Sequence, residues 1–386
     1  MKGSLTIFTA FGIPVKLHWT FVGILPYVVF LAYRADRLDT VPWLLGLFLL
    51  MFVSVTLHEY GHALTARVYG VTTKDIILSP IGGIARLTRL PEKPYQEFLI
   101  AAAGPFVNLV LGAALLIGWV AVGSFGGLRQ VLLSFYNSGL VLDSFVELLA
   151  LLVVLNVMLA VFNCLPAFPM DGGRMLRALL SIPFSRVLAT RIASLLGQLT
   201  AGGMMLFGLY SQDYILVLIG FFIFYTAAAE FRGVVLEDRL RRMSVRDAMR
   251  TGFTLVQPND TVGELSKYFA DDGEDNFLVE DPEQPETLIG VVEDRAFYKA
   301  LKKKANTLTV TELMLHEVQV VAPTDTLWEA FGKMQEHRTS ILAVRDDTNE
   351  LLGVVDLSGI NYRLSKKGRR ELAYAKARPL EGGVID

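Results

Sequence analysis

The sequence holds few charged residues and a single cysteine. Of its 386 residues, 19% are charged and 53% are hydrophobic, and the mean hydropathy is positive. Soluble globular domains rarely have this composition, so the low charge indicates a membrane protein. Cys164 stands alone, which excludes an internal disulfide framework. The formal net charge of -2 offers no basic face, and we therefore expect no nucleic-acid partner.

Long apolar segments lie before residue 236 and are missing after it. A helix needs about 20 apolar residues to cross a bilayer core of about 30 Å. Windows of this kind lie at 19–33, 43–66, 97–122, 145–165, 187–209 and 214–234. The sequence therefore predicts an α-helical polytopic membrane domain over residues 1–236, with about six transmembrane helices and the lipid bilayer as its surroundings.

Two short regions of this domain predict β structure. Residues 4–9 and 14–18 are expected to form strands around a turn at Gly12-Ile13-Pro14. Residues 76–87 are expected to form a β-hairpin around Pro80-Ile81-Gly82-Gly83 that dips toward the membrane. Non-helical backbone at that depth must be buried in protein or line a wet cavity. We therefore expect a small membrane-associated hairpin or sheet.

Basic residues gather in the loops on one side of the predicted spans. That side holds Lys2, Lys16, Arg67, Lys74, Arg86, Arg89, Lys93, Arg174, Arg177, Arg186 and Arg191, and the opposite loops hold Arg34, Arg37 and Arg129. Basic residues in short loops stay on the cytoplasmic side. We therefore expect a multi-pass protein of the cell membrane with both termini in the cytoplasm.

The chain repeats itself after residue 243. VRDAM at Val245 returns as VTELM at Val310, and GVV at Gly290 returns at Gly353. Each copy predicts helix, strand, helix, strand, strand and helix. The repeat resembles a pair of CBS domains, the α+β regulatory modules named after cystathionine β-synthase. The predicted divisions are a linker helix at 237–244, CBS domains at 245–304 and 309–365, and a C-terminal tail at 366–386.

The second apolar segment contains the motif HEYGH. On a helix, His58 and His62 share one face and can bind one metal ion, with Glu59 one position away. This spacing is typical of half of a metalloprotease site. The alternative is that these polar side chains are satisfied by neighbouring helices, but ionisable groups inside a membrane are costly unless they have a function.

A third metal ligand is expected elsewhere, because catalytic zinc usually takes three protein ligands and one water. Asp171 is the candidate, within NCLPAFPMDGGR. Pro166 and Pro169 must break the fourth helix, and Gly172-Gly173 allow close backbone approach. A carboxylate within a broken membrane helix is expensive unless it binds something. A solvated Asp171 in an interfacial loop is the alternative.

HEYGH and NCLPAFPMDGG together resemble the site-2 protease family, whose patterns are HExxH and NxxPxxPxDG in separate membrane helices. AAAGPFVNL, ending at Leu109, is similar to the GPxxN segment of that family. The resemblance implies one Zn²⁺ bound by His58, His62 and Asp171, and Glu59 as the catalytic base. It departs from the PDZ-bearing branches, since no PDZ domain lies between the spans.

Four other polar residues near these motifs have open roles. Asn163 is a candidate for substrate binding or for stabilising the oxyanion, although Asn163 and Asn108 could equally join helices by hydrogen bonds. Cys164 could bind metal but is interpreted as a small packing residue. His18, beside Trp19, is interpreted as an interfacial residue without a catalytic role.

The resemblance implies that the substrate is a transmembrane segment of another membrane protein, cut to release a cytoplasmic domain. An unwound segment could add as a strand to the edge of the 76–87 hairpin. Two alternatives remain. A CBS-regulated transporter would use the same residues as an ion path, although no second copy of either motif is found. A non-catalytic scaffold is disfavoured because the base and all three candidate ligands are present.

The repeat departs from CBS domains that bind adenosine nucleotides. Those domains use a hydroxyl for phosphate and a carboxylate for ribose, whereas the first copy has Glu293 and Ala296 at these positions. The second copy has Asp356 and Gly359. Acids at the phosphate positions would repel the ligand. We therefore expect poor nucleotide binding and a role in forming a homodimer or gating the site.

Overall fold

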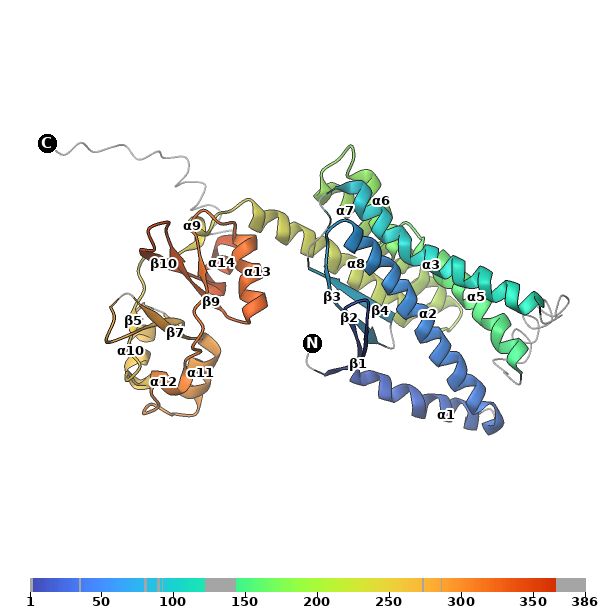
Figure 1. Cartoon of the computed structure of the whole chain (residues 1–386), viewed down its shortest axis with the longest axis horizontal. Helices are drawn as coiled ribbons and strands as arrows, with labels where there is room; N and C mark the ends of the chain where they lie inside the picture. The colour runs from blue at the N-terminus through green and yellow to red at the C-terminus, as the bar shows by residue number, and fades with distance from the viewer. Residues whose placement is uncertain are drawn as a thin grey trace. The chain divides into compact units, whose positions relative to one another are not determined.

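The computed structural model describes residues 3–34, 36–79, 82–88, 91, 93–121, 144–272, 274–285 and 287–365. The chain divides into two units, residues 1–234 and residues 235–386. The first unit contains the long apolar helices and one sheet, and the second contains two small sheets with their helices (Figure 1).

Five helices are long and apolar enough to cross a membrane among the described residues. The described helices of this unit, of which the last continues past residue 234, are α1 (Ile24–Arg34), α2 (Val41–Val68), α3 (Pro94–Ala121), α5 (Phe145–Asn163), α6 (Asp171–Leu180), α7 (Arg186–Tyr210) and α8 (Tyr214–Arg241). The five are α2, α3, α5, α7 and α8. The first predicted span forms a shorter apolar segment, Trp19–Arg34, made of a 3-10 turn and α1. The prediction of an α-helical polytopic membrane domain is confirmed.

Helices α2, α3 and α5 run side by side (Figure 1), and α6 packs against α3 and α7. The approach of α2 to α3 depends on a glycine, because a Cβ at Gly61 would lie 2.8 Å from the carbonyl oxygen of Ala103. Small residues at such crossings let two backbones come close together. The face of α2 that carries HEYGH therefore lies directly against α3.

The four strands of the first unit form one sheet in the order β1 (Ser4–Ala10), β2 (Ile13–His18), β3 (Thr73–Ser79) and β4 (Gly82–Leu87). Both predicted hairpins are present, and β2 pairs with β3 in parallel, which joins them. At the first turn Phe11 and Gly12 have positive φ. Of the predicted turn at 80–83, Pro80 and Ile81 lie outside the described residues.

A buried carboxylate links three strands of this sheet. Asp75 on β3 is 1% exposed and accepts hydrogen bonds from Arg86 Nε and Lys16 Nζ, each at 2.6 Å. The Arg86 guanidinium, followed by Lys16, lowers the pKa of Asp75 to about 2. The opposite face, which carries Ile13, Val15, Ile76 and Leu78, packs on Tyr60 and Ala63 of α2. The sheet is therefore attached to the helix that carries HEYGH.

The predicted break after the fourth long apolar segment is present. Helix α5 ends at Asn163, and α6 begins at Asp171, with Pro166 and Pro169 between them. A Cβ at Gly173 would lie 2.6 Å from the backbone nitrogen of Phe168, so the chain can fold back closely only with glycine here. This return brings the first residue of α6 into the helix bundle.

The second unit has two similar halves. The first contains α9 (Val245–Ala248), β5 (Leu255–Val256), α10 (Val262–Asp272), β6 (Phe277–Glu280), β7 (Leu288–Val292) and α11 (Asp294–Lys302). The second contains α12 (Val310–Leu313), β8 (Val320–Val321), α13 (Leu327–His337), β9 (Ile341–Arg345), β10 (Leu351–Asp356) and α14 (Leu357–Leu364). Both halves follow the predicted order of helix, strand, helix, strand, strand and helix. In both, the first two strands pair in parallel and the last two pair antiparallel.

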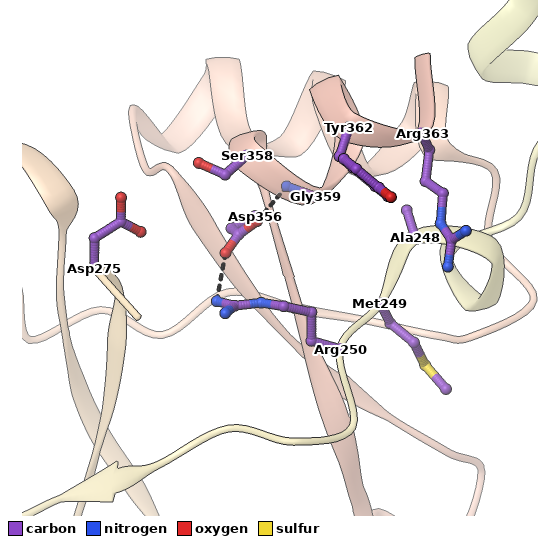
Figure 2. Close-up of a pocket in the computed structure, with 9 residues that line it drawn as sticks. All are labelled: Ala248, Met249, Arg250, Asp275, Asp356, Ser358, Gly359, Tyr362 and Arg363. Carbon is purple, nitrogen blue, oxygen red and sulfur yellow. Dashed lines mark hydrogen bonds and ion pairs between the residues drawn. The ribbon is translucent and has the colours of Figure 1, made fainter. Parts of the chain in front are cut away.

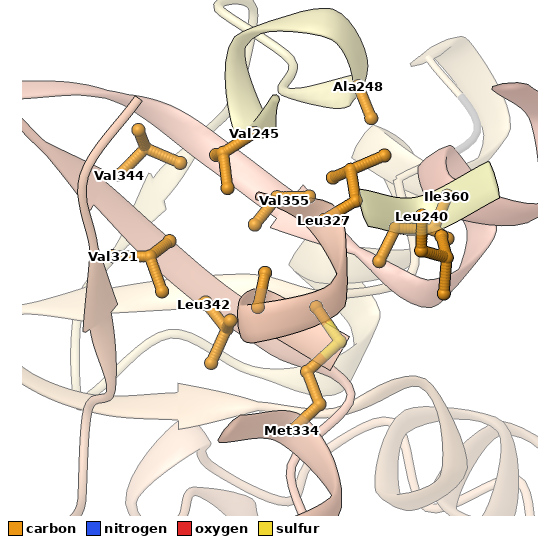
Figure 3. Close-up of a cluster of buried hydrophobic side chains, with 11 residues drawn as sticks. Leu240, Val245, Ala248, Val321, Leu327, Met334, Leu342, Val344, Val355 and Ile360 are labelled. Carbon is orange, nitrogen blue, oxygen red and sulfur yellow. The ribbon is translucent and has the colours of Figure 1, made fainter. Parts of the chain in front are cut away.

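The two halves exchange their first helices. Val245 and Ala248 of α9 pack in the core of the second half with Leu327 and Val355 (Figure 3). In the same way Val310 of α12 packs in the core of the first half. Each half therefore completes the core of the other, and the pair forms one folding unit.

Candidate metal centre

The site begins with two imidazoles on α2. His58 and His62 lie one helical turn apart and are both buried. Their rings are 4.7 Å apart between centroids, and their Nε2 atoms are 3.1 Å apart. Two ring nitrogens at this separation in a buried position can bind one ion between them.

Asp171 reaches the two imidazoles from α6. Its Oδ2 atom lies 3.1 Å from Nε2 of His58 and 3.1 Å from Nε2 of His62. The three donor atoms lie within 4.8 Å of one another, and all three residues are buried. Asp171 is also the first residue of α6, where the partial positive charge of the helix N-terminus favours a carboxylate. Residues from two distant motifs thus meet at one point.

The surroundings of the histidines fit a zinc ion. His62 Nδ1 lies 2.7 Å from the carbonyl oxygen of Ile100, and His58 Nδ1 bonds Oδ1 of Asn108. Both oxygens only accept, so each Nδ1 carries hydrogen and each Nε2 keeps its lone pair for a metal. A Cβ at Gly104 would clash with Nε2 of both rings, so glycine keeps the space beside them open.

Glu59 lies beside this cluster and is held by the sheet. Its Oε2 accepts a hydrogen bond from the backbone N–H of Ala85 on β4 at 2.8 Å. A Cβ at Gly83 would lie 2.6 Å from Cγ of Glu59, so the strand approaches closely only because it has no side chain there. The described donor cluster does not include Glu59. Its carboxylate therefore lies beside the three donors without being one of them.

The remaining candidate residues, Asn163, Cys164 and His18, lie outside the donor cluster. Asn163 is the last residue of α5 and is half-buried, and no described residue forms a hydrogen bond with its side chain. Cys164 is exposed and lies outside the described donor cluster. Its interpretation as a packing residue is therefore wrong, because no core covers it. His18 Nδ1 lies 2.8 Å from Thr20 Oγ1, and His18 is outside the described donor cluster.

Sequence reasoning missed a buried ion cluster that fixes α6. Arg177, treated above as a basic residue of a loop, is 1% exposed. Its Nε donates to Glu97 Oε1 on α3 at 2.6 Å, and its Nη1 to Glu230 Oε1 on α8 at 2.9 Å. The guanidinium also lies over the ring of Phe168. The available signal in the sequence was an arginine shortly after Asp171. Its partners could not be identified from the sequence, because they come from distant helices.

The comparisons with known proteins agree with this geometry. The model of peptidase family M50 matches residues 46–207, and the CBS domain model matches residues 310–366. The zinc metalloprotease MJ0392 of Methanocaldococcus jannaschii is 37% identical over 265 residues, which are 69% of this chain and 71% of that protein. The chain belongs to peptidase family M50. It is a membrane zinc metalloprotease of the site-2 protease family with a C-terminal CBS pair.

The comparisons found two further similarities. A relative in Synechocystis sp. is 26% identical over 380 residues and covers both parts of the chain, with 93% of this chain and 95% of the relative aligned. The solved site-2 protease from Methanocaldococcus jannaschii is 37% identical, with a TM-score of 0.45, and the match covers 59% of this chain and 95% of that chain.

The CBS pair of this site-2 protease contains a cavity of about 410 Å³ (Figure 2). Asp356 lines it, and its carboxylate is already engaged by Arg250 Nη2 and by the N–H of Gly359, each at 2.6 Å. Asp275 lies across the cavity, and its pKa is raised by burial and then by the charges of Asp356 and Asp294. Charged side chains of both signs line the cavity.

Proposed function

We propose that this site-2 protease hydrolyses a peptide bond within a transmembrane segment of another membrane protein. His58, His62 and Asp171 hold the zinc, and Glu59 is the catalytic base. The observation that carries the proposal is the convergence of three buried donor atoms within 4.8 Å, two on an apolar helix long enough to span a membrane and one just after the break of another.

The chemistry divides between the metal and the chain. When bound, zinc supplies a Lewis acid that lowers the pKa of water toward about 7 and polarises a carbonyl group. Glu59 takes the proton of the attacking water and returns it to the leaving amine. Its Oε2 is anchored by the Ala85 N–H, and no described residue bonds its Oε1. We assign Asn163, the last residue of α5, as a donor to the substrate carbonyl.

The sheet supplies a surface for the substrate. A transmembrane helix hides its carbonyls in its own hydrogen bonds and must unwind before hydrolysis. Strand β4 is an edge strand of the sheet and lies against Glu59. An unwound segment that adds beside β4 would satisfy its backbone groups next to the base.

The orientation and the CBS pair complete the proposal. The distribution of basic residues in the loops supports a cytoplasmic location of both termini and of the CBS pair. In this orientation, cleavage releases a cytoplasmic domain of the substrate. The CBS pair regulates the protease by forming a homodimer or by gating the site, and it binds nucleotides poorly. A CBS-regulated transporter is not retained, because the chain belongs to a peptidase family.

The test is co-expression with membrane-anchored candidate substrates, comparing wild type with Glu59→Gln. We expect wild type to produce a shortened fragment and the variant to produce none, at equal protein levels and with zinc retained, because glutamine cannot accept the proton. Cleavage by Glu59→Gln at a rate near that of wild type would refute the assigned base.

A further inference from the structure

We infer that Asn156, a residue of α5 whose described hydrogen bonds include none to a proposed metal ligand, sets the tautomer and direction of His58 through Asn108. The inference rests on the proposed role of His58 as a zinc ligand. Asn156 lies inside the apolar sequence LLVVLNVMLAV and is 0% exposed. It is a positioning residue, because it acts on the site through another side chain.

The direction of the Asn156 carboxamide is set by a backbone carbonyl. Its Nδ2 donates to the carbonyl oxygen of Leu152 at 2.9 Å, and a carbonyl can only accept. The second Nδ2 hydrogen goes to Ser54 Oγ at 3.2 Å, and Ser54 itself donates to the carbonyl oxygen of Leu50. A reversed carboxamide would place oxygen against oxygen at Leu152. Asn156 Oδ1 must therefore point the other way, toward α3.

The orientation of the Asn156 carboxamide fixes that of the Asn108 carboxamide, which contacts His58. Asn156 Oδ1 accepts from Asn108 Nδ2 at 2.9 Å, so Asn108 Oδ1 faces His58 and accepts from its Nδ1. A neutral imidazole has a single N–H, so a hydrogen on Nδ1 leaves the Nε2 lone pair free for zinc. The hydrogen bonds that connect Leu152 to His58 thus select the tautomer in which Nε2 can bind a metal.

Burial makes this selection strict. Asn108 and Asn156 are both 0% exposed, and Ser54 and His58 are each 6% exposed, so the surrounding residues leave little access for water to substitute for a lost partner. His62 differs, because its Nδ1 bonds the Ile100 carbonyl directly and needs no relay. The two ligands are therefore oriented independently, and a defect at Asn156 should affect His58 alone.

The test measures zinc affinity by chelator competition on the full-length protein in detergent. We expect Asn156→Leu to weaken zinc binding by about 10- to 100-fold, the range for residues behind zinc-bound histidines. In an Asn108→Ala background the same change should add nothing, because the relay is already cut. The matched control is Ser194→Ala, which removes a buried bond from α7 to the Ala227 carbonyl of α8 at 2.7 Å and should leave zinc affinity unchanged.

A second variant keeps the test decisive if Asn156→Leu folds poorly. In Asn156→Asp, burial keeps the carboxyl protonated, so it donates toward Leu152 and accepts from Asn108, and zinc affinity should stay within about threefold of wild type. Wild-type affinity in Asn156→Leu, additive effects of the two substitutions, or equal losses in Asp and Leu variants would each overturn the relay. Full zinc occupancy in His58→Ala would instead refute the proposed function.

Discussion

At the scale of single residues, the metal centre depends on the lack of a side chain at Gly104 as much as on its three donor residues. Two imidazoles and one carboxylate meet in a space that a methyl group at Gly104 would fill. Gly104 lies on α3, while the proposed ligands lie on α2 and α6. Glycine therefore contributes to the site by leaving room for a metal between helices.

Gly104→Ala should lower zinc occupancy and cleavage by at least about tenfold, because its Cβ would clash with Nε2 of His58 and His62. Zinc content and fragment release from the purified variant check this. Gly118→Ala is the matched control, since it lies on the same helix and its Cβ would meet no atom of the described residues within 4 Å. Full zinc occupancy in Gly104→Ala would show that the ion lies elsewhere.

The local sequence predicted the candidate residues to different degrees. His58 and His62 follow from helical spacing alone, and Asp171 follows from a carboxylate beside a helix break. Asn156 could not be predicted, because one asparagine in an apolar helix has no spacing that identifies its partner. The hydrogen bond from Asn108 becomes visible only when α3 and α5 are packed together.

At the scale of elements, the sheet determines where Glu59 lies. The two hairpins were predictable from alternating residues and turn signals, but their union was not. Strands β2 and β3 pair in parallel although α1 and α2 separate them in the chain. Helix α6 was also not predicted, since its ten residues are too short to stand out after two prolines.

The ion pairs of Asp75 should stabilise this sheet at neutral pH. Because its pKa is lowered to about 2, the stabilisation is present above about pH 4 and is lost as the pH falls toward 2. Asp75→Asn should cost about 1–2 kcal/mol at pH 7, less than the full shift implies, because the Arg86 side chain is 42% exposed.

The measurement is thermal unfolding of metal-free wild type and variant between pH 7 and pH 3. The difference in unfolding temperature should shrink as the pH falls below 4. Asp39→Asn is the control, since the pair of Asp39 with Arg37 is exposed and should contribute little. A difference that stays constant down to pH 3 would contradict the role of the Asp75 charge.

At the scale of the whole molecule, the basic loops predict the side of the membrane on which the site opens. In a Cys164→Ser background, a cysteine at position 36 should react with a membrane-impermeant reagent from outside. Cysteines at positions 93 and 186 should react only from the cytoplasmic side. The reverse pattern of labelling would move the site to the opposite leaflet.

The CBS pair should bind nucleotides weakly. Asp356 caps α14 and pairs with Arg250, so its carboxylate is engaged within the cavity and opposes a phosphate there. Calorimetry of ATP and AMP against the full-length protein should detect no binding in the micromolar range. Micromolar affinity that is lost in Asp356→Ala would restore nucleotide sensing as the regulatory signal.

The most direct test of the whole account is the metal content of the purified protein. Wild type should contain about one zinc ion per chain, and the double variant His58→Ala plus His62→Ala should contain almost none, because two of three proposed ligands are removed. Glu59→Gln should retain the ion, since Glu59 is proposed as a base and is outside the donor cluster. Full zinc occupancy in the double histidine variant would contradict the account.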